Sequence, residues 1–183
     1  SLGLPHQTPT VSWVGRFVST KNPMAMLHVV KLVREVVSDV RFLIVGAHKD
    51  QTNKMTGYIE RNKIKSNIVL FQDVADIKRI YHASDVLLST SVLEGFPNNI
   101  AEAMLCGIPV VATAVGAVPD LIPTKKNGFI HDPKDIDGMA GSIIRLILNA
   151  SLGREIGMRS RERILKNYTP KALCEYEMQF YSS

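Results

Sequence analysis

The sequence is poor in the residues that build disulfide-bonded or metal-centred folds. Its 183 residues contain two cysteines, Cys106 and Cys174, and five scattered histidines. Two distant cysteines match no disulfide framework or zinc motif, so a reducing, cytoplasmic compartment is expected. No two histidines stand four residues apart beside a carboxylate, so no bound metal is expected.

Long apolar runs are also missing. The longest are of strand length, so the sequence predicts no membrane-spanning helix. No basic start followed by an apolar core marks a signal peptide, and residues 1–9 are interpreted as a leader or a cloning remnant. The net charge of +5 is too small to indicate nucleic-acid binding, but it suits a site that attracts a polyanion.

Several nucleotide and hydrolase motifs are absent as well. The chain has no Gly-x-Gly-x-x-Gly after its first apolar run and no Gly-x-x-x-x-Gly-Lys-Ser/Thr, which argues against a dehydrogenase and a P-loop phosphotransferase. It has no Gly-x-Ser-x-Gly elbow, which argues against an α/β-hydrolase.

The sequence does contain a regular alternation of short apolar runs and helical patterns. Strands are predicted over residues 11–17, 41–45, 68–71, 86–89, 109–112 and 128–130. Helices are predicted over residues 23–37, 53–63, 77–82, 99–105, 136–149, 152–166 and 170–181. This alternation is typical of βαβ units, so we expect an α/β fold with a doubly wound parallel sheet of about six strands. Residues 10–167 would form one domain, and residues 168–183 a C-terminal helix.

In such a sheet, ligands bind in the crevice outside the carboxyl ends of the strands. The loop after the first strand carries Gly15, Arg16 and Lys21. A guanidinium fork and an ammonium group together suit a diphosphate. The alternative is that both cations are solvated loop residues, and their spacing alone does not decide between these interpretations.

The loop after the fourth strand runs from residue 89 to residue 102. Gly95 permits a tight backbone, and Pro97 fixes its own φ. Asn98 or Asn99 is expected to cap the following helix, whose free N–H groups and dipole would form an anion site.

Two carboxylates, Glu94 and Glu102, flank this expected anion site. Carboxylates repel phosphates, so both are better suited to accept hydrogen bonds from hydroxyl groups on either side of a diphosphate. The alternative for Glu102 is structural, because Asn99-x-x-Glu102 matches a capping box. The alternative for Glu94 is a solvated loop acid.

Four motifs in order resemble a known family. Residues 94–113 (EGFPNNIAEAMLCGIPVVAT) contain Glu-x7-Glu and resemble the signature of the family-4 retaining glycosyltransferases. Residues 15–22 resemble their diphosphate loop, residues 81–85 their Tyr-x-x-Ala/Ser-Asp, and residues 127–133 their late segment. The similarity covers residues 11–169.

The resemblance implies the C-terminal, donor-binding Rossmann-like half of a GT-B enzyme. It assigns Arg16 and Lys21 to the diphosphate, Glu94 to the donor sugar and Glu102 to the ribose, with Glu94, Arg16 and Lys21 as the catalytic group. The remaining substrate-binding residues predicted are Gly15, Val74, Gly95, Phe96, Asn98, Asn99 and Ile100. The donor would be a UDP- or GDP-sugar, with no metal and no other cofactor.

Three features depart from the family pattern. Pro97 replaces a common glycine and has no N–H to donate, so a phosphate would depend on Asn98 and Asn99. Thr90 stands where many members have proline. The segment before Val74 lacks a frequent glycine, which leaves the base contact at Val74 without a motif behind it.

The resemblance also implies partners. A glycan or lipid-linked acceptor would bind a missing N-terminal domain, toward which residues 168–183 would dock, and no nucleic acid is expected. The basic residues 154–166 are interpreted as a solvated helix face, with peripheral membrane contact as the alternative. Two other functions stay open: a nucleotide-sugar 2-epimerase-like enzyme and a non-catalytic nucleotide-binding module.

Overall fold

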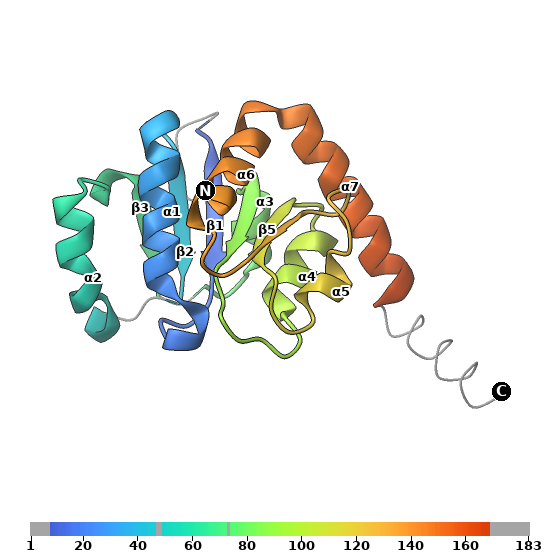
Figure 1. Ribbon diagram of the computed structural model, residues 1–183, viewed down its shortest axis with the longest axis horizontal. Helices are drawn as coiled ribbons and strands as arrows, with labels where there is room; N and C mark the ends of the chain where they lie inside the picture. Colours follow the sequence, from blue (N-terminus) through green and yellow to red (C-terminus); the bar gives the residue numbers. More distant parts are fainter. Residues whose placement is uncertain (1–7, 47–48, 73, 169–183) are drawn as a thin grey trace.

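The computed structural model describes residues 8–46, 49–72 and 74–168, with residues 49–54 described by their backbone alone (Figure 1). Six strands form one sheet in the order β3-β2-β1-β4-β5-β6, and every neighbouring pair is parallel. The strands are β1 (Thr10–Val14), β2 (Arg41–Val45), β3 (Ile68–Phe71), β4 (Val86–Ser89), β5 (Val110–Thr113) and β6 (Phe129–His131). The doubly wound parallel sheet expected from the sequence is therefore confirmed.

Helices cover both faces of the sheet (Figure 1). They are α1 (Pro23–Val36), α2 (Lys49–Arg61), α3 (Lys78–His82), α4 (Asn98–Leu105), α5 (Val118–Leu121), α6 (Ile136–Leu148) and α7 (Ala150–Asn167), with 3-10 turns η1 (Ser19–Lys21) and η2 (Lys65–Asn67). One buried cluster joins α1, α2 and α6 to one sheet face, and two others join α3, α4 and α5 to the opposite face. Burial on both faces explains why the strands are apolar nearly throughout.

The first connections run outward from β1 to β2 and β3, and the later ones run in the opposite direction through β4, β5 and β6. The strand order therefore reverses between β1 and β4, which makes their carboxyl ends the switch point, the place where sheets of this kind bind ligands. The loops that follow β1 and β4, together with α4, carry the predicted site residues other than Val74, which follows β3.

Most element boundaries agree with the sequence-based prediction. Three strands, β2, β3 and β4, have the predicted bounds. The first strand ends at Val14, three residues early, because the chain turns and packs Phe17 edge-on against Trp13, with ring centroids 5.4 Å apart. The short helix α5 was not predicted, and the helix predicted over residues 170–181 lies outside the described residues.

The loops after β1 and β2 approach each other closely. Gly46 follows β2 with φ 92°, and a Cβ on it would lie 2.5 Å from the carbonyl oxygen of Gly15. Only glycine fits this contact, because a side chain would displace the backbone of the neighbouring loop.

None of the helices in the described part of the chain is long and apolar enough to cross a bilayer.

Candidate functional site

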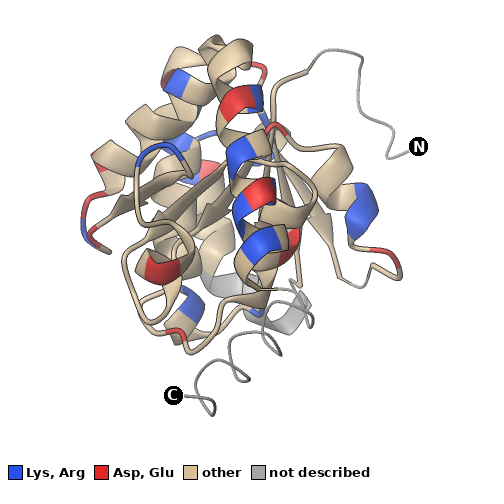
Figure 2. Ribbon diagram, turned by 90° about the vertical axis from the view of Figure 1, so that its right-hand side faces the viewer, with Lys and Arg blue, Asp and Glu red and all other residues tan. Residues whose placement is uncertain are grey.

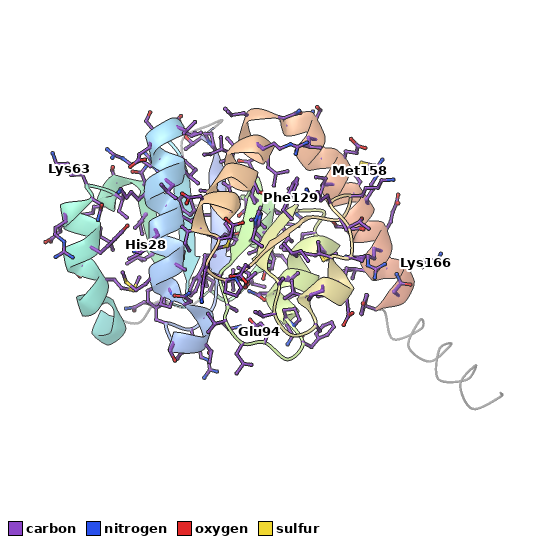
Figure 3. All side chains as sticks on the ribbon, in the orientation of Figure 1. His28, Lys63, Glu94, Phe129, Met158 and Lys166 are labelled. Carbon is purple, nitrogen blue, oxygen red and sulfur yellow. The ribbon has the colours of Figure 1, made fainter. Side chains whose placement is uncertain are left out.

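Glu94 lies where the loops after β1 and β4 meet, at the lower edge of the sheet in Figure 3. The Lys21 ammonium forms an ion pair with Glu94 Oε1, and the Ser91 hydroxyl donates to the same oxygen at 2.7 Å. The side chains of Lys21 and Glu94 are 22% and 10% exposed. Glu94 is thus a largely buried, charge-paired carboxylate, and the alternative of a solvated loop acid is wrong.

Backbone contacts reinforce this junction. The Val92 N–H donates to the Thr20 carbonyl at 2.8 Å, which ties the loop after β4 to η1. The Gly15 N–H donates to the Val45 carbonyl at 3.1 Å. A Cβ on Gly15 would lie 3.5 Å from the Lys21 side chain, so the aliphatic stem of Lys21 lies over Gly15.

Arg16 differs from Lys21 although both follow β1. Its side chain is exposed, and within the described residues no ion pair or hydrogen bond engages its guanidinium. One predicted cation is therefore fixed on Glu94, whereas the other remains available at the rim of the crevice.

The start of α4 departs from the expected capping. Pro97 is the N-cap, and no side chain caps the helix, so the prediction that Asn98 or Asn99 does so is wrong. The Asn99 side chain instead donates to the Val14 carbonyl at 2.9 Å, and its Oδ1 accepts from the Ile100 N–H at 3.0 Å. Asn99 thereby ties α4 to the end of β1.

The loop before α4 presents unused donors. Among the described residues, the N–H groups of Gly95, Phe96 and Asn99 have no hydrogen-bond partner, whereas the Asn98 N–H donates to the Phe96 carbonyl. The Ile100 side chain is fully buried in the core, so its contribution to the site is limited to packing. Free amides beside a helix start can bind an anion.

Glu102 lies in a different environment from Glu94. It is exposed on α4, and its Oε2 accepts a hydrogen bond from the Tyr81 hydroxyl at 2.9 Å. Burial, together with this bond to the carboxylate, raises the pKa of Tyr81, so the phenol remains a donor. Because Glu102 is the fifth residue of α4 and its described contact is Tyr81, the capping-box alternative is wrong.

A third loop, after β5, completes the junction. The rule that ligands bind at the carboxyl ends of the strands selects this loop, but none of its residues was among the predicted site residues. Gly116 has φ 53°, and a Cβ on it would lie 2.0 Å from the Glu94 carbonyl oxygen. The Ala117 N–H donates to the Gly95 carbonyl at 3.2 Å, and the Thr113 hydroxyl donates to the Ser91 carbonyl at 2.5 Å. The signal for these contacts in the sequence is a single glycine after β5.

Two further features lie beside this junction. Phe96 and Tyr168, with ring centroids 6.0 Å apart, line a hollow of about 480 Å³ together with α5 and Arg163. Val74 follows β3 and packs against the cluster of Leu43, Val45 and Ile80, and no described contact joins it to Glu94 or Lys21.

The charges of α7 are mixed (Figure 2). Arg159 pairs with Glu155 at 2.7 Å, and Arg163 donates to the Leu121 and Asp120 carbonyls. Peripheral membrane contact through this helix stays a prediction.

The parallel strand order, with its switch point between β1 and β4, defines a Rossmann-like α/β domain. A family model described as glycosyl transferases group 1 matches residues 8–149. The chain therefore belongs to the group 1 glycosyltransferases, and the family expected from the four motifs is confirmed.

Two curated relatives illustrate the similarity. The chain is 30% identical over 176 residues to the poly(ribitol-phosphate) alpha-N-acetylglucosaminyltransferase of Staphylococcus aureus (strain COL), covering 94% of this chain and 35% of the relative. It is 28% identical over 152 residues to the N-acetyl-alpha-D-glucosaminyl L-malate synthase of Bacillus anthracis, covering 82% of this chain and 39% of the relative. The chain thus spans well under half the length of these relatives.

Solved structures share the fold. A variant of S. aureus TarM in complex with fondaparinux, alpha-GlcNAc-glycerol and UDP superposes with a TM-score of 0.85 at 28% identity, over 99% of this chain and 37% of that one. The C-terminal domain of the group 1 glycosyltransferase LpcC from Francisella tularensis superposes with a TM-score of 0.79 at 23% identity, over 90% of this chain and 89% of that one.

Proposed function

We propose that this chain binds the nucleotide-diphosphate sugar donor of a retaining glycosyltransferase, which transfers a hexose-type sugar to a glycan or lipid-linked acceptor. The observation that carries the proposal is the Lys21–Glu94 pair at the switch point, beside the unpartnered amides of Gly95 and Phe96. This arrangement places positive charge, free N–H donors and an oriented carboxylate in one crevice.

The diphosphate would be held by cations and amides. One proton of the Lys21 ammonium engages Glu94, which leaves two donors for phosphate oxygens. The exposed guanidinium of Arg16 would add a bidentate contact from the rim. As the bond to the sugar breaks, negative charge grows on the leaving diphosphate, and these preorganised donors would stabilise it.

The two carboxylates would bind hydroxyl groups. Both Lys21 and Ser91 engage Glu94 Oε1, so Oε2 is available to accept from a hydroxyl of the transferred sugar. Glu102 is oriented by Tyr81 and exposed, which suits a hydroxyl of the ribose. Phe96 and Asn99 would contribute their free backbone N–H groups. Gly15 and Asn98, whose N–H groups are already engaged, would line the site, and Val74 would approach the base.

UDP is the nucleotide we favour over GDP, because TarM at 28% identity was crystallised with UDP. The N-acetylglucosaminyl names of two curated relatives support a hexose-type sugar. The acceptor would bind a part of the protein outside these residues, so we expect the 183-residue chain to bind donor without robust transfer.

A thermal-shift panel of UDP, GDP, ADP and their glucose or N-acetylglucosamine derivatives tests the proposal. A ligand present at 100 times its dissociation constant should stabilise the chain by about 2.7 kcal/mol. Stabilisation by one nucleotide and its sugar derivative is the expected result. No shift with any of these ligands would contradict a donor site.

A further inference from the structure

We propose that Thr90 is a positioning residue, which holds the turn carrying Lys21 in the geometry that the diphosphate requires. Because the cation concerned is the Lys21 ammonium of the proposed donor site, the inference rests on the proposed function.

The Thr90 hydroxyl lies between the core and the loop after β1 that carries Arg16 and Lys21, which we call the cation loop. Its side chain is 1% exposed at the end of β4, and its Oγ1 accepts a hydrogen bond from the indole N–H of Trp13 at 3.0 Å. The same oxygen lies 3.0 Å from the Lys21 carbonyl and 3.1 Å from the Asn22 carbonyl. A hydroxyl has one proton to give, and the indole can only donate, so the Thr90 proton must point to the Lys21–Asn22 turn.

This turn needs such support. Asn22 has φ 48°, a left-handed conformation that costs energy in a residue with a side chain, and it joins η1 directly to α1. Conformations of this kind persist where the surroundings fix them, and they gather at functional sites. Four contacts hold this residue: the Thr90 hydroxyl, the Ala25 N–H, which donates to the Asn22 side chain at 3.3 Å, the Ser19 carbonyl, which accepts from the Asn22 N–H at 3.1 Å, and the Met26 N–H, which donates to the Asn22 carbonyl at 3.4 Å. Of these four, the Thr90 hydroxyl is the contact from outside η1 and α1.

Trp13 provides a rigid base for the contact. It is 2% exposed, and its ring meets Phe17 edge-on beneath the loop that begins at Gly15. A Cβ on Gly15 would lie 3.5 Å from the Trp13 ring. The indole therefore orients Thr90, and Thr90 transmits that position to the backbone of Lys21.

Thr90→Val tests this role in the full chain. Valine has the shape of threonine but can neither accept from Trp13 nor donate to the turn. We expect affinity for UDP to fall about five- to tenfold, the equivalent of one hydrogen bond. Affinity for UMP, which lacks the phosphate expected on Lys21, should change less than about twofold. Both would be measured by calorimetry, with GDP and GMP used instead if the thermal-shift panel selects guanine.

Two matched variants separate positioning from stability. Thr90→Ser keeps the hydroxyl and should restore UDP affinity. Thr10→Val removes another buried threonine hydroxyl, bonded to the Thr8 carbonyl at the opposite end of β1, and should leave both affinities unchanged. An equal loss of UDP and UMP affinity in Thr90→Val would make Thr90 merely structural and overturn the proposal.

A double-mutant cycle tests whether Thr90 acts through Lys21. In a Lys21→Met background, Thr90→Val should cost no further UDP affinity. If Thr90→Val lowers UDP affinity in the Lys21→Met background as much as it does in the wild type, the role proposed for Thr90 is overturned. If Lys21→Met alone weakens UDP binding as expected, the proposed donor site still stands in that case. If the wild type binds neither nucleotide, the proposed function itself fails.

Trp13→Phe covers the case in which Thr90→Val does not fold. It removes the indole N–H but keeps an aromatic ring in the core. A loss of UDP affinity without a loss of UMP affinity supports the proposal, and an equal loss or none overturns it.

Discussion

Glu94 and Glu102 are eight residues apart in one motif, yet they occupy opposite kinds of surroundings. Glu94 is 10% exposed and is fixed by a cation from one loop and a hydroxyl from another. Glu102 is exposed on a helix and meets a single phenol. A carboxylate with its charge already paired is prepared for one ligand geometry, whereas an exposed one tolerates several. The difference predicts that the two acids recognise different parts of the donor.

The largest effect is expected when the Lys21 ammonium, which pairs with Glu94, is removed, because among the described residues Glu102 has no such cation. Lys21→Met leaves a largely buried carboxylate unpaired and deletes a phosphate donor, so UDP affinity should fall about 30- to 100-fold. Calorimetry with UDP measures the loss. Lys31→Met removes an exposed lysine that pairs with Glu35 across one helix turn at 3.9 Å, and it should have no effect. Equal behaviour of the two variants would refute the role of Lys21.

The comparison sharpens with Glu94→Ala, which should weaken binding of the UDP-sugar about tenfold while leaving UDP within about threefold. The reason is that Glu94 is expected to contact the sugar rather than the nucleotide. Competition between UDP and UDP-N-acetylglucosamine, followed by calorimetry, measures the ratio. Equal losses of affinity for UDP and UDP-N-acetylglucosamine would contradict the contact between Glu94 and the sugar.

Glu102→Ala should show no selectivity between the nucleotide and the sugar nucleotide. If Glu102 binds the ribose, UDP and the UDP-sugar should weaken together by about fivefold. Tyr81→Phe removes the phenol that orients Glu102, and it should give a smaller loss of the same kind. The same pattern in Glu94→Ala and Glu102→Ala would contradict the division between the two acids.

A third carboxylate, Asp135, lies outside the proposed donor site and serves as a reference for the other two. Two hydrogen bonds lower the pKa of Asp135 from its usual value of 3.8. The larger effect is that of the His131 side chain, and the smaller is that of the Gly138 N–H. A lowered folded-state pKa contributes stability above the unfolded value, and that stability is lost as pH falls through the folded value. Asp135→Asn should therefore be less stable than the wild type at neutral pH, and the difference should shrink as pH falls below 3.8 and through the lowered folded-state value. Urea unfolding between pH 2 and 7 measures it, and a change in nucleotide affinity would show that the variant is not a neutral reference.

Much of this arrangement is readable from the sequence. The runs that form β2 and β4 are largely buried, and β3 at the sheet edge is an apolar run of the same kind, so their apolar residues begin and end with the strands. The meeting of Lys21 and Glu94 follows from parallel strands, which bring the loops after β1 and β4 to one edge.

The rest depends on contacts that no local pattern encodes. Asn99 looks like a cap, but the Val14 carbonyl, 85 residues earlier, takes its amide. Tyr81 reaches Glu102 only because α3 and α4 lie on the same face of the sheet. Gly116 closes on Glu94 through a loop whose path is set by β5 and β6. Each of these is a product of tertiary packing rather than of spacing.

The burial of Trp13 has an optical consequence. It is the only tryptophan in the sequence, and its indole is sealed beneath the cation loop against Thr90 and Phe17. All tryptophan emission from the chain therefore originates one side chain away from the Lys21–Asn22 turn. Ligand binding near this turn is therefore expected to shift the wavelength or the intensity of the Trp13 fluorescence, so binding can be followed without a label. Trp13→Phe, which has no tryptophan, gives the background signal.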